Sequence, residues 1–168
     1  MKRYSILLIG FLLAGSFVAG YAVGNKQDKK DIEPGVHGIG GIFFKCKDPK
    51  SLKKWYDENL GFKNNQYGTV FEWRQAGDST KHGYTQWSPF KETTKYFEKE
   101  FMINYRVGNM DLLLANLKAK GILPIDTVES ASYGKFVHIK DPEGNRIELW
   151  EANDIEYEKL GEGQATLY

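Results

Sequence analysis

The feature that most constrains the fold is a local pattern that occurs twice along the chain. Residues 39–62 and residues 101–122 each begin with a strand-like apolar run and continue with apolar side chains at helical spacing. Each expected helix has a polar N-terminal cap, Asp48 followed by proline in the first copy and Asn109 in the second. A glycine follows the cap by 13 residues in the first copy and by 12 in the second, as a left-handed C-terminal cap requires. The duplication predicts two similar structural units.

Further strand-like runs follow each expected helix. They cover residues 69–75 and 84–88 after the first helix, and residues 136–140 and 146–151 after the second. Residues 141–145 lie between the last two runs and have the composition of a type I turn with glycine at the bulge position. We therefore expect an α+β fold of two tandem βαβββ repeats, whose mixed sheets pair to form a cleft.

An apolar segment precedes this domain. Lys2 and Arg3 come before an almost uninterrupted apolar run over residues 6–23, which is typical of a signal peptide and is also close to the length that spans a membrane. We interpret residues 1–24 as a hydrophobic helix that acts either as a cleaved signal peptide or as a retained membrane anchor. Polar residues 25–35 are interpreted as a linker. The protein is thus expected to be exported or anchored in the inner membrane.

The rest of the chain divides into a domain and a tail. Residues 36–152 are expected to form the domain, and residues 153–168 a C-terminal tail. The aromatic and charged segment 89–100 joins the repeats and is either a lid over the cleft or only a crossover. A formal net charge of +1 without a basic arm argues against nucleic acid as a partner. The single cysteine, Cys46, excludes an intramolecular disulfide.

Two motifs resemble a known superfamily. Residues 47–56, followed by Leu60-Gly61-Phe62, are similar to the first helix of the glyoxalase/bleomycin-resistance/dioxygenase superfamily, also called the vicinal-oxygen-chelate (VOC) superfamily. Residues 141–150 are similar to its C-terminal hairpin. The resemblance covers residues 36–152 and implies the same cleft. It does not choose a reaction, because the superfamily contains metal-dependent lyases, isomerases and dioxygenases as well as metal-free proteins that sequester a drug.

The resemblance also implies four metal-ligand positions in the metal-dependent members. In this chain they fall on Gly41, on Trp87 or its neighbour Gln86, near Met102, and on Glu148. Only Glu148 is a usual ligand, whereas an enzymatic metal site needs three or four converging nitrogen or oxygen donors. No metal or other cofactor is therefore expected. A divalent metal remains an alternative, with three fallback donors: His37, Glu72 and Asn104.

Side-chain alternation assigns candidate residues to the cleft. If the turn at residues 141–145 pairs as expected, His138 lies directly opposite Glu148, and the two could act as a general acid/base pair. The same pair could instead be purely structural. Asn104 and Arg106 share a face of their strand, where the arginine either recognises an anionic ligand or pairs with an acidic residue of the sheet. The further candidate ligand-binding residues on strands are Trp87, Trp150 and Glu72.

Three functions agree with these observations. The first is a protein of this superfamily, exported or tethered to a membrane, that binds a small organic ligand in its cleft without the usual metal. The second is a lyase, isomerase or dioxygenase that uses either a metal or the acid/base pair. The third is an interaction module of the cell envelope with a degenerate cleft. The expected partners are a small-molecule ligand and the membrane, and a homodimer is compatible with all three.

Overall fold

The computed structural model describes residues 33–161 and 165–167. The apolar segment at residues 1–24 and the linker up to residue 32 lie outside the described residues, so their predicted roles are not tested. Within the described part of the chain, no helix is long and apolar enough to cross a membrane.

The first structural unit contains three strands and one helix. Its elements are β1 (Gly35–Cys46), α2 (Pro49–Leu60), β2 (Thr69–Gln75) and β3 (Asp78–Lys91). The bounds of β2 match the sequence prediction, whereas β3 is longer than predicted at both ends. The residues just before Tyr84 are extended because they pair with β2 as far as its last residues.

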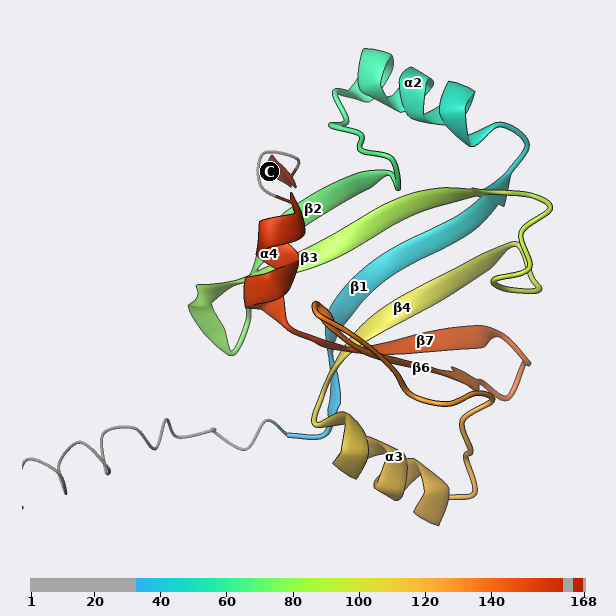
Figure 1. Cartoon of the computed structure of the whole chain (residues 1–168), viewed down its shortest axis with the longest axis vertical. Coiled ribbons are helices and arrows are strands. Elements are labelled where there is room, and N and C mark those ends of the chain that lie inside the picture. The colour runs from blue at the N-terminus through green and yellow to red at the C-terminus, as the bar shows by residue number, and fades with distance from the viewer. Residues whose placement is uncertain (1–32, 162–164, 168) are drawn as a thin grey trace, which may run out of the picture. The chain divides into compact units, whose positions relative to one another are not determined.

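The second structural unit follows the same plan with one more strand. Its elements are β4 (Phe101–Gly108), α3 (Met110–Ala119), β5 (Glu129–Ala131), β6 (Gly134–Lys140) and β7 (Arg146–Ala152). Figure 1 shows the two units, with α2 and α3 at opposite ends of the set of strands.

Local sequence signals set the ends of these elements. The Asp48 side chain accepts hydrogen bonds from two backbone N–H groups of the first turn of α2, and Gly61 ends this helix with φ +73°. Asn109 caps α3 in the same way, through the backbone N–H of Leu112. Between β6 and β7, the Asp141 carboxylate accepts the backbone N–H of Asn145 at 2.8 Å. The predicted caps and the predicted turn are therefore confirmed.

All the described strands belong to one mixed sheet. Its order is β5-β6-β7-β4-β1-β3-β2-β8, and its two central strands, β4 and β1, are antiparallel. On each side of this centre the first strand of a unit pairs in parallel with its last strand, β1 with β3 and β4 with β7. The two halves are thus related by an approximate twofold repeat, and the predicted α+β fold of duplicated units is confirmed.

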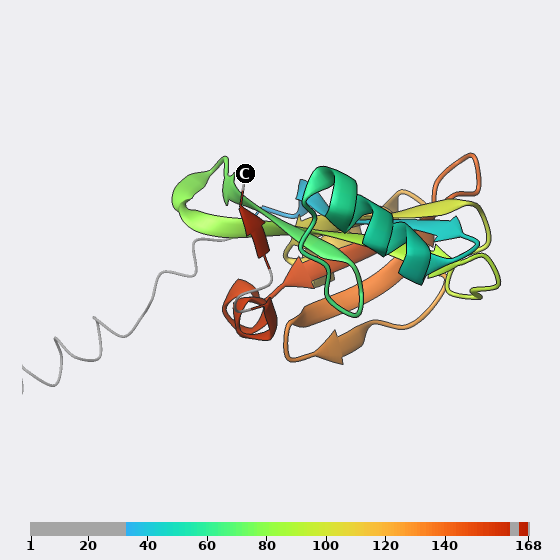
Figure 2. The same cartoon turned by 90° about the horizontal axis from the view of Figure 1, so that it is seen from above.

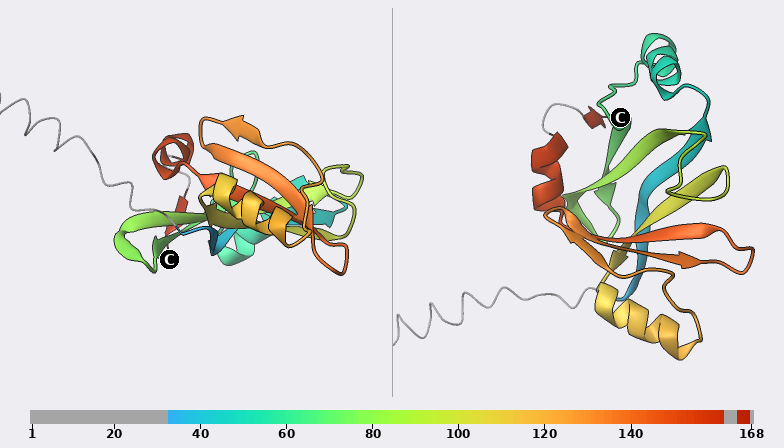
Figure 3. Two further views of the ribbon diagram at one scale, coloured as in Figure 1. Left: turned by 90° about the horizontal axis from the view of Figure 1, so that it is seen from below. Right: turned by 45° about the vertical axis from the view of Figure 1, so that its right-hand side comes forward.

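The C-terminal segment completes the first half of the sheet. The first unit is βαββ rather than the predicted βαβββ. Between α2 and β2 the chain turns at Asn65, whose side chain accepts two backbone N–H groups at 2.7 and 2.9 Å. Instead, β8 (Ala165–Leu167) pairs with β2. β8 is the edge strand next to β2, just as β5 is the edge strand next to β6. With α4 (Asp154–Gly161), the predicted tail is thus part of the folded domain. The views in Figures 2 and 3 show α4 apart from the other two helices.

The two faces of the sheet have different roles. On one face α3 covers a buried aliphatic cluster that contains Met110, Val137 and Leu149. On the same face the Tyr56 ring of α2 packs on Trp87 of β3, with ring centroids 4.7 Å apart. Because side chains alternate along a strand, the neighbours of these core residues point to the opposite face. That face carries the candidate site.

Candidate functional site

A cavity of about 860 Å³ opens on the face of the sheet opposite α2 and α3. This volume falls in the range of roughly 300–1,000 Å³ that is common for small-molecule sites. Eight aromatic residues line it: Phe43, Tyr67, Phe90, Tyr96, Tyr133, Phe136, Trp150 and Tyr157. The polar lining residues are Asn65, Gln66, Gln86, Ser88, Asn104, Thr127, Glu129, His138 and Glu148.

Segments outside the repeats form two walls of this cavity. Tyr157 and Leu160 come from α4. Tyr96 comes from the segment that joins the repeats, which was predicted as either a lid or a crossover. The next residue, Phe97, is only 1% exposed and belongs to a core cluster with Phe43 and Met102. This segment is therefore a crossover anchored in the core, and it also provides a wall of the cavity.

The Glu148 carboxylate is the polar centre of the cavity. Strand pairing places Glu148 of β7 beside Asn104 of β4 and directly opposite His138 of β6. Its oxygen Oε1 accepts from the Tyr96 hydroxyl and lies 3.1 Å from His138 Nε2, while Oε2 accepts from Asn104 Nδ2 at 2.5 Å. Glu148 is 2% exposed, so these donors replace the water that a carboxylate otherwise needs. The predicted position of His138 directly opposite Glu148 is therefore confirmed.

A second carboxylate orients the histidine from the other side. Asp126 Oδ2 lies 2.7 Å from His138 Nδ1, and Asp126 also pairs with Arg146 at 2.9 Å. Burial of the ring opposes protonation, but the hydrogen bond and charge of Glu148 outweigh it, so the pKa of His138 lies above its ordinary value. Burial also acts against ionisation of Asp126, but hydrogen bonds from His138 lower the pKa of this carboxyl. The pKa of Tyr96 is raised, first by burial and then by the charge of Glu148.

We expect His138 to make the stability of the protein depend on pH. Because folding raises its pKa, the stabilisation is complete below the unfolded value of about 6.5 and is lost as pH rises through the folded pKa. In that window the free energy of unfolding should fall by up to about 1.4 kcal/mol per pH unit. Asp126, with its lowered pKa, acts in the opposite direction and only at acidic pH.

Urea unfolding of the wild type and of His138→Gln at a series of pH values measures this contribution. The variant should lose the decrease above about pH 6.5. The same substitution at His37, which is exposed at the start of β1, should keep it. A His138→Gln profile parallel to that of the wild type would show that the histidine does not carry the effect.

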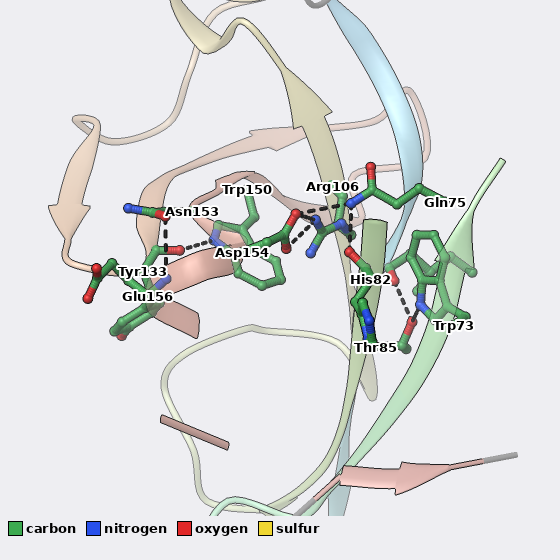
Figure 4. A network of polar contacts seen from close by, with 11 residues as sticks. Trp73, Gln75, His82, Thr85, Arg106, Tyr133, Trp150, Asn153, Asp154 and Glu156 are labelled. Carbon is green, nitrogen blue, oxygen red and sulfur yellow. Dashed lines mark hydrogen bonds and ion pairs between the residues drawn. The ribbon is translucent and has the colours of Figure 1, made fainter. Parts of the chain in front are cut away.

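Arg106 lies beside the cavity and forms an ion pair with an acidic residue. Its Nη2 donates to both carboxylate oxygens of Asp154, at 2.6 and 2.7 Å. Its guanidinium carbon lies 5.0 Å from the Trp150 ring and 5.8 Å from the Trp73 ring. Figure 4 shows Arg106 between these two tryptophans, with Gln75 also reaching Asp154. Arg106 was predicted either to recognise an anionic ligand or to pair with an acidic residue of the sheet. The structure shows an acidic partner, but this partner is Asp154 of α4 and not a residue of the sheet.

The other predicted ligand-binding residues divide between the two faces of the sheet. Trp150 and Asn104 line the cavity, as predicted. Trp87 does not, because it lies on the helix face in contact with Tyr56. Glu72 does not line the cavity either, and its carboxylate contacts the His82 ring on β3.

Several solved structures share this architecture. The Streptomyces coelicolor methylmalonyl-CoA epimerase in complex with 2-nitronate-propionyl-CoA is 16% identical, with a TM-score of 0.53 over 71% of this chain and 99% of that chain. A methylmalonyl-CoA epimerase in complex with methylmalonyl-CoA and NH4+ is also 16% identical, with a TM-score of 0.53 over 71% of this chain and 96% of that chain. This chain has the VOC fold.

Other comparisons give a weaker similarity or none. A glyoxalase/bleomycin resistance protein/dioxygenase superfamily member from Vibrio splendidus is 16% identical, covers 67% of this chain and 96% of that chain, and has a TM-score of 0.42. No model of a protein family and no curated protein sequence matches the chain. At 16% identity, the similarity to the two epimerase structures establishes the fold and not a reaction.

Within this VOC fold, strand register identifies the four implied metal positions. Gln86, Gly41, Asn104 and Glu148 form one row across β3, β1, β4 and β7. The position predicted near Met102 corresponds in this register to Asn104, which is two residues further along and is one of the fallback donors, whereas Met102 itself is fully buried in the core. The pairing of β1 with β4 has two register shifts, which sequence spacing does not reveal.

The donors in this row do not fit the usual metal centre. Gly41 has no donor, Gln86 and Asn104 carry neutral amides, and Glu148 already accepts hydrogen bonds on both oxygens. Catalytic metals are usually held by several histidine or carboxylate ligands. Among residues 33–161 and 165–167, no group of three or more His, Cys, Asp or Glu side chains could hold a metal ion.

Sequence reasoning missed the residues that come from loops and from the C-terminal segment. Tyr96 and Asp126 reach Glu148 and His138 from irregular segments that have no periodicity. Asp154 and Tyr157 lie in the segment that was predicted to be a C-terminal tail outside the domain. A usable signal was present there, because Asn153 precedes acidic residues in the first turn of α4 and its side chain accepts the backbone N–H of Glu156.

Proposed function

We propose that the protein binds a small organic molecule with a largely apolar or aromatic body in this cavity, without the usual VOC metal centre. The observation that carries the proposal is an aromatic cavity of about 860 Å³ around one buried carboxylate. The groups in contact with this carboxylate are protein side chains. A cleft of this kind binds by burying an apolar surface and uses a few polar groups to orient the ligand.

A second candidate is a reaction by acid/base catalysis in the same cavity. It is favoured by one observation, the contact of His138 with both Glu148 and Asp126, which fixes the orientation of the imidazole. In such a reaction His138 or Glu148 would exchange a proton with the ligand. Binding is the better supported of the two, because both nitrogens of His138 already contact a carboxylate.

We also propose that the protein meets its ligand outside the cytoplasm or at the membrane. The proposal is supported by Lys2, Arg3 and the apolar run over residues 6–23, which have the composition of an export signal or anchor. Mass spectrometry of the protein from separated cell fractions measures its N-terminus and its location. An intact N-terminus in the cytoplasmic fraction would contradict the proposal.

Ligand binding can be tested by screening organic compounds against the full chain for an increase in the melting temperature. A ligand present at about 100 times its Kd should add about 2.7 kcal/mol to the free energy of unfolding. Thr127→Trp, at the exposed rim of the cavity, should weaken binding of any compound found. Leu123→Trp, which lies four residues earlier and does not line the cavity, is the matched control.

Two outcomes would decide against this function. If no compound stabilises the protein, or if Thr127→Trp and Leu123→Trp respond alike, the cavity is not the binding site. Chemical conversion of a bound compound, lost in His138→Gln, would favour the acid/base reaction instead.

A further inference from the structure

Two oxygen atoms in the cavity have unused capacity to accept hydrogen bonds. Among the described residues, the one hydrogen bond to Glu148 Oε2 comes from Asn104 Nδ2, which leaves a second lone pair. Oδ1 of Asn104 has no hydrogen-bond partner in the described part of the chain, although Asn104 is only 2% exposed. An unpaired polar atom at such depth is costly, so its persistence calls for an explanation.

Asn104 meets an aromatic ring at Gly40. A Cβ atom placed on Gly40 would lie 2.2 Å from Asn104 Oδ1, 2.7 Å from the Trp150 ring and 3.0 Å from Cγ in the apolar stem of Arg106. Gly40, Asn104, Glu148 and Trp150 all line the cavity. Asn104 and Trp150 converge on a residue that has no side chain of its own, and Asn104 Nδ2 donates to Glu148 Oε2, so the amide oxygen, the indole and the carboxylate border one part of the cavity.

The charges around the cavity favour a positive ligand. No lysine or arginine is among the described residues that line it, whereas both Glu129 and Glu148 are. Arg106 and Arg146 lie near the site, but they are bound by Asp154 and Asp126. His138 is the one basic side chain among the described lining residues, and it contacts only Oε1 of Glu148 and leaves Oε2 to a ligand. With two carboxylates against one imidazole, the lining still favours a positive ligand.

The aromatic lining supports the same choice. The face of an aromatic ring attracts a cation within about 6 Å of its centroid. Trp150 already receives one such cation, because the Arg106 guanidinium carbon lies 5.0 Å from its ring. Phe90 and Tyr96 are stacked with centroids 5.7 Å apart, next to the Glu148 carboxylate that Tyr96 contacts.

We infer that Glu148 Oε2 and Asn104 Oδ1 form a cation subsite beside Gly40, and that the ligand is a protonated primary or secondary amine with an aromatic or alkyl body. This inference rests on the proposed binding function. The amine must carry N–H groups, because two acceptor oxygens need hydrogen-bond donors and not charge alone. An organic carboxylate is excluded by repulsion from Glu148.

Three indole compounds that differ in one group test the subsite. Tryptamine, 3-ethylindole and indole-3-propionate have similar apolar bodies and end in an ammonium, a methyl and a carboxylate group. Calorimetric titration of the full wild-type chain should give a Kd for tryptamine about tenfold or more below that for 3-ethylindole. Indole-3-propionate should bind more weakly than either. This series needs no variant, so it does not depend on the folding of a mutant.

Glu148→Gln then tests whether the Glu148 carboxylate is the group that favours a positively charged ligand. The variant keeps the side-chain volume and should bind tryptamine and 3-ethylindole with Kd values within about threefold of each other. Glu100→Gln removes the same charge from an exposed position before β4 and should keep the wild-type preference.

Each outcome has a separate meaning for the subsite and for the proposed function. Equal binding of 3-ethylindole and tryptamine by the wild type would overturn the cation subsite while leaving ligand binding intact. Equal charge preference in Glu148→Gln and Glu100→Gln would also overturn it. If none of the three probes binds while another compound stabilises the protein through the cavity, the subsite is again wrong and the binding function stands.

Discussion

Replacement of Asp154 by alanine is expected to lower the free energy of unfolding by about 3 kcal/mol. Asp154 provides both oxygens that accept from Arg106 Nη2, and the Arg106 side chain is only 8% exposed. Its Nη1 atom is already buried without a partner among the described residues. Without Asp154, the guanidinium would be a buried charge with no opposite charge in contact, and such a loss costs more than the ion pair itself contributes.

A double replacement separates this cause from a general loss of packing. Arg106→Met removes the buried charge and keeps an apolar stem between Trp73 and Trp150. The double variant Arg106→Met/Asp154→Ala should therefore be more stable than Asp154→Ala alone in urea unfolding at 25 °C. Asp111→Ala is the control, because Asp111 is 83% exposed and its ion pair should contribute about 1 kcal/mol or less.

The control and the double variant also define the result that would contradict the prediction. If Asp154→Ala costs no more than Asp111→Ala, the buried ion pair does not hold α4 in place. A double variant that is less stable than Asp154→Ala would show that Arg106 contributes through its own packing. Hydrogen exchange of α4 gives a second measurement, because this helix should lose protection in Asp154→Ala.

The parts of the fold that were predictable depend on short-range chemistry. Asp48 and Gly61 limit a helix by hydrogen bonds within a few residues, and the turn at residues 141–145 fixes the register of β6 with β7 by itself. The C-terminal strand was not predictable in this way. β8 pairs with residues nearly 100 positions earlier, and it does so because the turn around Asn65 leaves the edge of β2 open.

The same distinction holds for the site. His138 and Glu148 could be paired from the sequence because one tight turn determines their register. Asn104 was predicted to face the cleft but could not be placed directly beside Glu148, because β4 and β7 are separated by a helix and two strands, and the expected position fell near Met102. The contact of Asp126 with His138 could not be predicted for a third reason. Asp126 lies in a loop whose position is set by the hydrogen bond from the backbone N–H of Ile125 to the carbonyl of His138.

Replacement of Glu148 by alanine is the second substitution expected to have a large effect, about 3 kcal/mol or more in the free energy of unfolding. It removes the acceptor for Tyr96, for Asn104 and for the Nε2 atom of His138 at once. Each buried group left without a partner costs about 1–3 kcal/mol. Glu143→Ala, an exposed substitution in the turn before β7, should stay within about 0.5 kcal/mol of the wild type.

A double-mutant cycle shows whether the carboxylate and the histidine act as one unit. His138 is held between Asp126 and Glu148, so removal of either His138 or Glu148 breaks the same contact. The combined loss in His138→Ala/Glu148→Ala should therefore be smaller than the sum of the single losses by about 1 kcal/mol or more. Additive losses would mean that the 3.1 Å contact contributes nothing to stability. The charge of Glu148 would then be held mainly by Tyr96, which donates to Oε1, and by Asn104, which donates to Oε2 and leaves its second lone pair to a cationic ligand.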